Sequence, residues 1–195
     1  MATFRWILWG LVVAVAIGLG ALYAMRGTGL TPPASNAIGG PFTLSNVAGG
    51  RFTDADLKGK ATALFFGFTN CPDVCPTTLT EATTWLDALG PDADKLRVVF
   101  VTVDPERDTT DHLKLYLSSF DPRMVGLTGT QAEVDVIKKA YRVFARKVPT
   151  GSDYTMDHTA TVYLLDANGQ FTGTIGYQEA KESALEKLRR LINRG

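Results

Sequence analysis

The stretch ATALFFGFTNCPDVCP, residues 61–76, decides the fold and contains the only two cysteines of the chain, Cys71 and Cys75. Residues 61–68 form a continuous apolar and aromatic run of strand length, which is typical of a central strand buried on both faces of a sheet. Two thiols directly after such a strand can close into a redox disulfide or bind a soft metal ion as thiolates. The sequence therefore predicts a reactive site at a strand-to-helix junction.

The segments on either side of this stretch predict alternating strands and helices. Residues 96–103 form a second buried strand, and residues 77–89 have helical spacing that stops at Gly90 and Pro91. This order predicts one α/β domain in which helices pack on a mixed central sheet. Further strands are expected at 42–46, 51–53, 124–127, 159–165 and 171–175, the last two as an antiparallel hairpin, and further helices at 111–119, 132–144 and 180–193.

The residues around the cysteines leave a metal site and a disulfide as alternatives. Each cysteine precedes a proline, which disfavours helical backbone, so we expect Cys75 to be a helix N-cap and Pro76 the first helical residue. At a helix N-terminus the Cys75 thiol should lose its proton readily. No basic residue lies between Lys60 and Lys95, and Asp73 lies between the cysteines, so the charges favour a bound cation. A static disulfide would close a short loop and add little stability.

The chain has two histidines that could complete a metal site, His112 and His158. His112 lies near the start of a charged helix and is expected to be exposed, whereas His158 directly precedes the predicted strand at 159–165. The loop entering that strand can lie beside the cysteine loop. Two thiolates and one imidazole suit Cu(I), or Zn(II) with a fourth ligand. A hydrogen-bonded structural histidine is the alternative at this position.

Asp104 ends the second buried strand, so we expect it at the same sheet edge as Cys71. It can act as a turn residue fixed by Pro105, or it can hydrogen-bond to groups of the site. Met156 offers a thioether near His158, but packing beneath the loop is the expected role of its side chain.

The N-terminal segment differs from the rest of the chain. Residues 6–25 contain no charged residue and are flanked by arginines, and their number matches a membrane-spanning helix. A cleaved signal peptide is the alternative, with residues 14–16 resembling a cleavage site, but the apolar run continues past them. We expect a membrane anchor at 1–26, a flexible linker at 27–40 and an exported domain at 41–195.

The overall charge argues against one class of partner. The 195 residues have a formal net charge of zero, and no run of basic residues is interleaved with aromatic ones. Nucleic acid is therefore not an expected partner.

Four segments together carry a resemblance to a known family: GFTNCPDVCPTTL at 67–79, FVTVDPERDT at 100–109, GLTG at 126–129 and DHTA at 157–160. With these segments the chain resembles the Sco/SenC family of membrane-anchored, thioredoxin-like copper proteins. The resemblance covers most of residues 41–192, and it is specific because all four segments agree. One departure is Asn70, which stands where histidine is more usual in that family.

The resemblance implies a function and a set of ligands. It implies that Cys71, Cys75 and His158 bind a copper ion, as Cu(I) or Cu(II), and that Asp104 lies near the site. It implies a thioredoxin-like fold and a metallochaperone rather than an enzyme. Such a protein receives copper from an upstream donor and delivers it to the CuA site of cytochrome c oxidase subunit II. With the predicted anchor, we expect a single-pass protein of a cell inner membrane whose C-terminal domain faces the periplasm, rather than a protein of the mitochondrial inner membrane.

Two enzyme classes are the alternatives. A thiol–disulfide oxidoreductase that reduces the cysteines of the copper-receiving partner is allowed by the same resemblance. Against it, the cysteine spacing has one residue more than that of thioredoxins, and His158 and Thr159 stand where thioredoxins have a proline before the facing strand. A peroxiredoxin is disfavoured because Phe68 and Pro72, rather than threonine, lie three residues before the cysteines.

Overall fold

The computed structural model describes residues 6, 9–10, 14–15, 18 and 38–194. Within that described part of the chain, no helix is long and apolar enough to cross a membrane. Most of the predicted anchor and linker at 1–40 lies outside the described residues, so the anchor stays a prediction. The segment Ala37–Gly195 is a compact unit with its own hydrophobic core, as expected of a domain that folds by itself.

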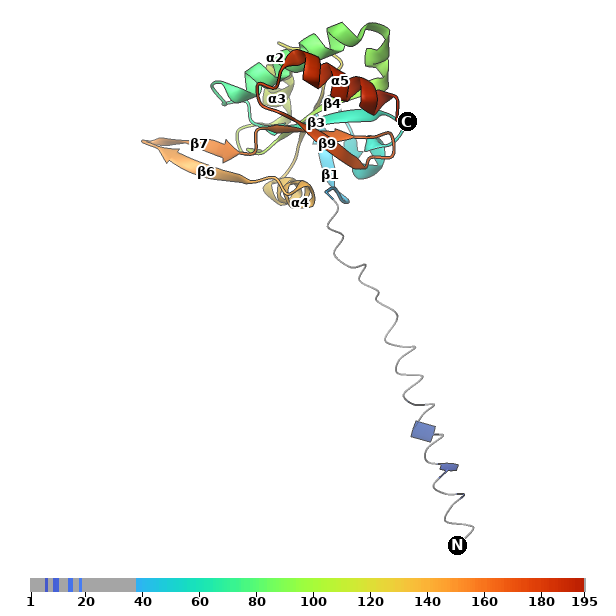
Figure 1. The fold of residues 1–195 in the computed structure, drawn as a ribbon. Helices are drawn as coiled ribbons and strands as arrows, with labels where there is room; N and C mark the ends of the chain where they lie inside the picture. Colours follow the sequence, from blue (N-terminus) through green and yellow to red (C-terminus); the bar gives the residue numbers. More distant parts are fainter. Residues whose placement is uncertain (1–5, 7–8, 11–13, 16–17, 19–37, 195) are drawn as a thin grey trace. The chain divides into compact units, whose positions relative to one another are not determined.

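The compact unit follows the predicted alternation of strands and helices (Figure 1). Its elements are β1 (Thr43–Asn46), β2 (Arg51–Thr53), η1 (Asp54–Leu57), β3 (Ala61–Gly67), α2 (Val74–Leu89), η2 (Gly90–Lys95), β4 (Leu96–Thr102), α3 (Thr110–Leu117), β5 (Val125–Thr128), α4 (Gln131–Tyr141), β6 (Ala145–Thr150), β7 (Asp153–His158), β8 (Thr161–Leu165), β9 (Phe171–Gly176) and α5 (Lys181–Ile192).

The main sheet has seven strands in the order β2-β1-β5-β4-β3-β8-β9. β3 pairs with β4 in parallel and with β8 in antiparallel orientation, so the sheet is mixed, as the sequence predicts. Every residue of β3 is buried, because the strand lies in the middle of the sheet with helices on both faces. The predicted α/β architecture is therefore confirmed.

Neighbouring residues of β3 face opposite layers of the sandwich. Phe65 points to the side of Phe100, its register partner on β4, whose ring contacts Tyr116 of α3. Phe66 points to the other side, where its ring contacts Tyr141 of α4. Figure 1 correspondingly shows α2 and α5 above the sheet and α4 below it. This alternation brings Gly67, on the same face as Phe65, under the start of α2.

One prediction about the cysteine loop is wrong. Helix α2 begins at Val74 with Asp73 as its N-cap, so Cys75 lies inside the first helical turn instead of capping it. Pro76 then occupies the third position of the helix, where its missing N–H costs nothing, because first-turn N–H groups have no partner inside the helix. Burial of the Cys75 side chain, which is 0% exposed, overrides the preference of a residue before proline for extended backbone.

Two strands of the structure, β6 and β7, were not predicted. β6 and β7 form an antiparallel hairpin that pairs Ala145 with His158 and Thr150 with Asp153, and the two strands form a sheet of their own. Figure 1 shows the hairpin extending from the body of the domain. Its residues are mostly polar and partly exposed, so no apolar run marks it as a strand. His158 is consequently the last residue of a strand and not part of a loop.

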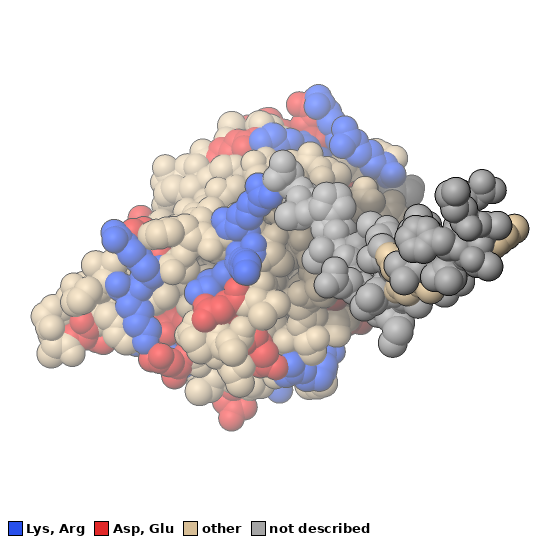
Figure 2. Space-filling view, turned by 90° about the horizontal axis from the view of Figure 1, so that it is seen from below, with Lys and Arg blue, Asp and Glu red and all other residues tan. Residues whose placement is uncertain are grey.

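The surface of the domain mixes charges of both signs. Figure 2 shows Lys and Arg side chains beside Asp and Glu side chains on one face. Several of these charges are paired, as in the ion pair of Arg146 with Asp157 within the hairpin and that of Lys147 with Glu106, which joins the hairpin to the turn after β4.

Candidate metal centre

The cysteine loop leaves the end of β3 and is held by a buried carboxylate. Asp108 accepts hydrogen bonds from the backbone N–H of Thr69 at 3.1 Å and from its hydroxyl at 2.6 Å. The N–H of Cys71 donates to the carbonyl of Phe68 at 3.3 Å, which closes a tight turn. Both cysteines are free thiols, Cys71 half-buried and Cys75 buried. The N–H of Cys75 points at Cys71 Sγ from 3.4 Å, so the two sulfurs face a common space.

The close approach of Cys75 to the sheet requires a glycine in β3. A Cβ atom at Gly67 would lie 2.7 Å from Cys75 Sγ and 2.7 Å from the ring of Phe100. Such distances are far below van der Waals contact, so no larger residue fits without displacing the thiol or the ring. Gly67 therefore makes room for the sulfur.

His158 reaches the cysteines from the end of β7. Its Nδ1 is 3.0 Å from the carbonyl of Thr159, and its Nε2 is 3.6 Å from Cys75 Sγ. A carbonyl can only accept, so this hydrogen bond assigns the proton to Nδ1 and leaves the Nε2 lone pair facing the thiols. The rings of Phe65 and Phe68 pack against the imidazole edge to face, at centroid distances of 6.4 and 5.6 Å. The Nε2 atom of His158 thus lies where it could bind a metal ion together with the thiols.

Three ligand atoms meet at this point. The sulfurs of Cys71 and Cys75 and a ring nitrogen of His158 all lie within 4.8 Å of one another. Two soft thiolates and an imidazole in partly buried surroundings match the preference of Cu(I) for few, soft ligands. The prediction that segments 83 residues apart converge here is confirmed.

The two thiols have opposite pKa shifts. The hydrogen bond from the Cys75 thiol, helped by the N–H groups of Cys75 and Asp73, lowers the pKa of Cys71 to about 4 despite partial burial. The same hydrogen bond, burial and the neighbouring Cys71 charge raise the pKa of Cys75 above its ordinary value. The expectation that Cys75 is the readily deprotonated thiol is therefore wrong, because Cys71 has the lower pKa of the two.

Asp104 follows β4 and is buried, with 1% of its surface exposed. Its Oδ1 accepts a hydrogen bond from the Tyr154 hydroxyl at 2.9 Å, whereas Oδ2 has no hydrogen-bond partner. Burial raises the pKa of this carboxyl, and the Tyr154 hydrogen bond opposes that shift. Asp104 is not one of the three clustered ligands, and it contacts the hairpin that ends in His158.

The remaining candidates lie away from the cluster. His112 is exposed, as expected, and its Nδ1 hydrogen-bonds with the carbonyl of Arg107 at 3.0 Å. Met156 is 9% exposed and belongs to the hydrophobic core, as expected. Asp108 and Tyr154 were not predicted to have a role at the site. Asp108 stood in the segment FVTVDPERDT and could have been noticed there, whereas no sequence pattern marks Tyr154.

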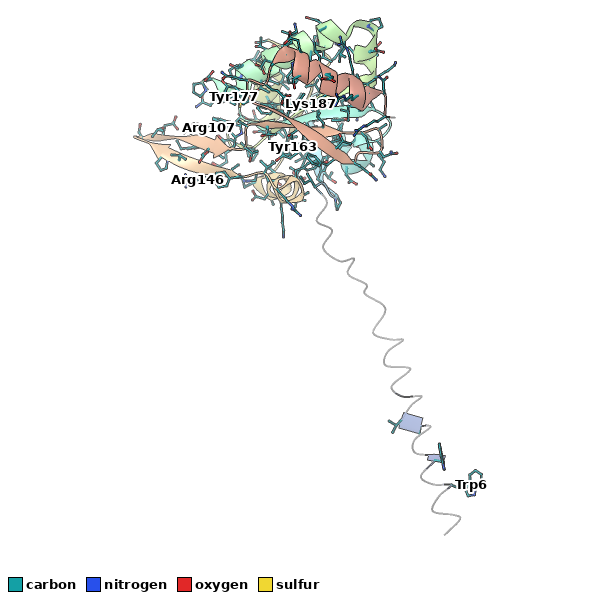
Figure 3. All side chains as sticks on the ribbon, viewed as in Figure 1. Trp6, Arg107, Arg146, Tyr163, Tyr177 and Lys187 are labelled. Carbon is teal, nitrogen blue, oxygen red and sulfur yellow. The ribbon has the colours of Figure 1, made fainter. Side chains whose placement is uncertain are left out.

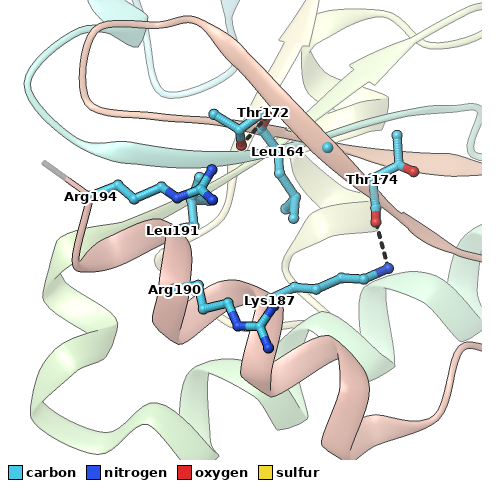
Figure 4. Close-up of a pocket in the computed structure, with 8 residues that line it drawn as sticks. Leu164, Thr172, Thr174, Lys187, Arg190, Leu191 and Arg194 are labelled. Carbon is cyan, nitrogen blue, oxygen red and sulfur yellow. Dashed lines mark hydrogen bonds between the residues drawn. The ribbon is translucent and has the colours of Figure 1, made fainter.

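A pocket between β9 and α5 is separate from this centre (Figure 4). Its lining includes the basic side chains of Lys187, Arg190 and Arg194. Lys187 Nζ donates to the carbonyl of Thr174 at 2.9 Å and to the carboxylate of Glu179 at 2.8 Å. No cysteine or histidine lines this pocket, so it is not a candidate for a soft metal ion.

The family model described as SCO1/SenC matches residues 31–193. The chain belongs to the SCO1/SenC family. Among curated relatives, the mitochondrial protein SCO2 of Saccharomyces cerevisiae is 44% identical over 81% of this chain and 54% of its own length. The SCO2-like protein RC0895 of Rickettsia conorii is 35% identical over 92% of this chain and 94% of its own length. The chain spans about half the length of the yeast relatives.

Solved structures of SCO1/SenC relatives have the same fold. Copper-bound ScoI of Bradyrhizobium japonicum is 52% identical, with a TM-score of 0.75, over 80% of this chain and 99% of that one. Copper-bound yeast Sco1 is 39% identical, with a TM-score of 0.74, over 80% of this chain and 89% of that one. The thioredoxin-like fold class is therefore confirmed for this SCO1/SenC chain.

Proposed function

We propose that the chain is a copper metallochaperone that binds one copper ion through Cys71, Cys75 and His158. The observation that supports this most directly is the convergence of two sulfurs and an unprotonated imidazole nitrogen within 4.8 Å. Relatives with the same fold have been solved with copper bound. When bound, the copper ion would be the cargo, and the two thiolates and the imidazole would hold it.

We further propose that the chain delivers this copper ion to an acceptor protein. Copper would pass from an upstream donor to this domain and then to the CuA site of cytochrome c oxidase subunit II, with residues 1–26 anchoring the domain to the membrane. Cys71 is half-buried, so an acceptor thiolate can reach the metal from solvent and replace one ligand at a time. A cell inner membrane, with the domain on the periplasmic side, would place donor, chain and acceptor in one compartment.

Copper binding is tested with the reduced domain, residues 27–195, which contains the whole compact unit. We expect one Cu(I) per chain, loss of binding in Cys71→Ser and Cys75→Ser, and weaker binding in His158→Ala. The matched control is His112→Ala, because His112 is exposed and is not part of the cluster of Cys71, Cys75 and His158. Equal Cu(I) affinity of the His112 and His158 variants would contradict the ligand assignment.

Delivery is tested separately by mixing the copper-loaded domain with the soluble CuA domain of a subunit II. Copper should leave the chaperone and appear in the acceptor, which is measured after separating the two proteins. A loaded domain that retains all of its copper beside an empty, reduced acceptor would contradict delivery.

A second candidate function is reduction of the acceptor's cysteines, which the opposite pKa shifts of the two thiols favour. The Cys71 thiolate would attack the partner disulfide and form a mixed disulfide, and one partner sulfur would leave as a thiolate. Cys75 would then lose its proton and attack Cys71 Sγ. The partner leaves as a dithiol, and the chain retains a Cys71–Cys75 disulfide, so two electrons pass to the partner.

This alternative is tested by counting free thiols after the reduced domain meets an oxidised CuA domain. Gain of two thiols in the acceptor and loss of two in the chain would support it. Rapid reduction of insulin would show a general reductase instead of a dedicated one.

A further inference from the structure

The position of His158 depends on contacts outside the main sheet. β6 and β7 pair only with each other among the described residues, and His158 is the last residue of the hairpin. Backbone hydrogen bonds of the seven-stranded sheet therefore do not fix the distance between the imidazole and the thiols. Side-chain contacts of the hairpin with the domain contribute to that distance, among them Met156 in the hydrophobic core and the rings of Phe65 and Phe68 against the imidazole.

The polar contacts among them come from one turn. We call residues 104–108, which follow β4, the clamp turn. The Tyr154 hydroxyl donates to Asp104 Oδ1 at 2.9 Å, and Arg107 Nη1 donates to the Tyr154 carbonyl at 2.9 Å. The guanidinium carbon of Arg107 lies 3.4 Å from the centroid of the Tyr154 ring. Figure 3 labels Arg107 beside the hairpin.

The buried contacts dominate this attachment. Ion pairs of Arg107 with Asp153 and of Lys147 with Glu106 are partly exposed, and such pairs contribute little. The Tyr154 hydrogen bond, by contrast, reaches a carboxylate that is 1% exposed and has no other hydrogen-bonding side chain. A hydrogen bond to a buried carboxylate is among the stronger ones, and losing it leaves the carboxylate with only the ion pair to Arg107 Nε at 3.8 Å.

The clamp turn also holds the cysteine loop. Its last residue, Asp108, is 0% exposed and accepts from Thr69, two residues before Cys71, and from the Thr102 hydroxyl at 2.6 Å. One short segment is thus attached to both halves of the metal centre. Asp108 holds the thiol side, and Asp104 with Arg107 holds the imidazole side.

We propose that Tyr154 and Arg107 are positioning residues that set the distance of His158 from the two thiols and thereby the affinity for copper. This inference rests on the proposed copper function. The two residues bind no metal and act through the hairpin alone. Loosening their contacts should leave the two sulfur ligands in place and weaken the bond between copper and the third ligand, His158.

The decisive experiment is a double-mutant cycle on Cu(I) affinity, measured by competition with a chelator. Tyr154→Phe keeps the ring over Arg107 and removes only the hydroxyl. We expect it to weaken binding by about tenfold in the wild-type background, a typical cost for a partner of a metal ligand. In the His158→Ala background it should have no effect. A loss of equal size in both backgrounds, or none in either, would overturn the proposal.

A readout without copper separates this inference from the proposed function. In the metal-free domain, Tyr154→Phe and Arg107→Lys should shift the imidazole nitrogen resonances of His158, because the ring moves from the thiols. Unchanged resonances in both variants would overturn the positioning role, even in a domain that binds no copper. Arg146→Gln is the matched control, because Arg146 pairs with Asp157 on the hairpin and not with the clamp turn.

Discussion

Replacing Gly67 by alanine tests whether the fold makes room for a metal-binding sulfur. The added methyl carbon would lie 2.7 Å from Cys75 Sγ and 2.7 Å from the Phe100 ring, so both must move by about 1 Å to reach ordinary contact. Cys75 and Phe100 are each 0% exposed, so neither has free space to enter. Overpacking of this kind costs about 2 kcal/mol. For a domain of this size, that lowers Tm by on the order of 5 °C.

The same displacement should weaken copper binding, because Cys75 Sγ is only 3.6 Å from His158 Nε2 and has to share a metal with it. Urea unfolding of the metal-free domain and Cu(I) competition measure the two effects separately. The matched control is Gly173→Ala in β9, where an added Cβ meets nothing within 4 Å. It should leave both quantities nearly unchanged. If Gly67→Ala matched Gly173→Ala in stability and affinity, the steric reasoning would be refuted.

Two further predictions concern the polar groups beside the cysteines. Because the pKa of Cys71 is about 4 and that of Cys75 is raised, iodoacetamide should alkylate Cys71 alone at pH 6. Mass mapping would detect the opposite order. Separately, the buried Tyr116 hydroxyl has no hydrogen-bond partner, so Tyr116→Phe should leave the free energy of unfolding equal or higher. A loss of more than about 1 kcal/mol in urea unfolding would show that the hydroxyl has a partner.

Much of the fold could be predicted from local sequence. The run at 61–68 is apolar throughout, and only the middle of a covered sheet buries such a strand on both faces. β2 has the predicted bounds, and β4 ends one residue early. α4 ends three residues before its predicted end, because Arg142 adopts left-handed backbone with a φ of 55°. Boundaries of this kind depend on single residues and carry little sequence signal.

The predictions that failed concern the candidate metal centre. Cys75 is inside α2 and keeps its proton, because burial beside Gly67 and the negative Cys71 outweigh the helix N-terminus. The hairpin that ends in His158 was not predicted, since its residues neither alternate cleanly nor form an apolar run. The attachment of this hairpin depends on the contact of Tyr154 with the clamp turn. Tyr154 and Asp104, which form its hydrogen bond, are 50 residues apart in the chain.

The amino-acid sequence alone determined the central strand, the mixed α/β order and the two thiols after β3, because these depend on composition and spacing within short segments. The tertiary structure alone decided which thiol is charged, how Nε2 of His158 faces the sulfurs, and which side chains hold it there. Those properties depend on burial and on distances of a few ångströms between segments remote in the chain. No local pattern encodes such distances.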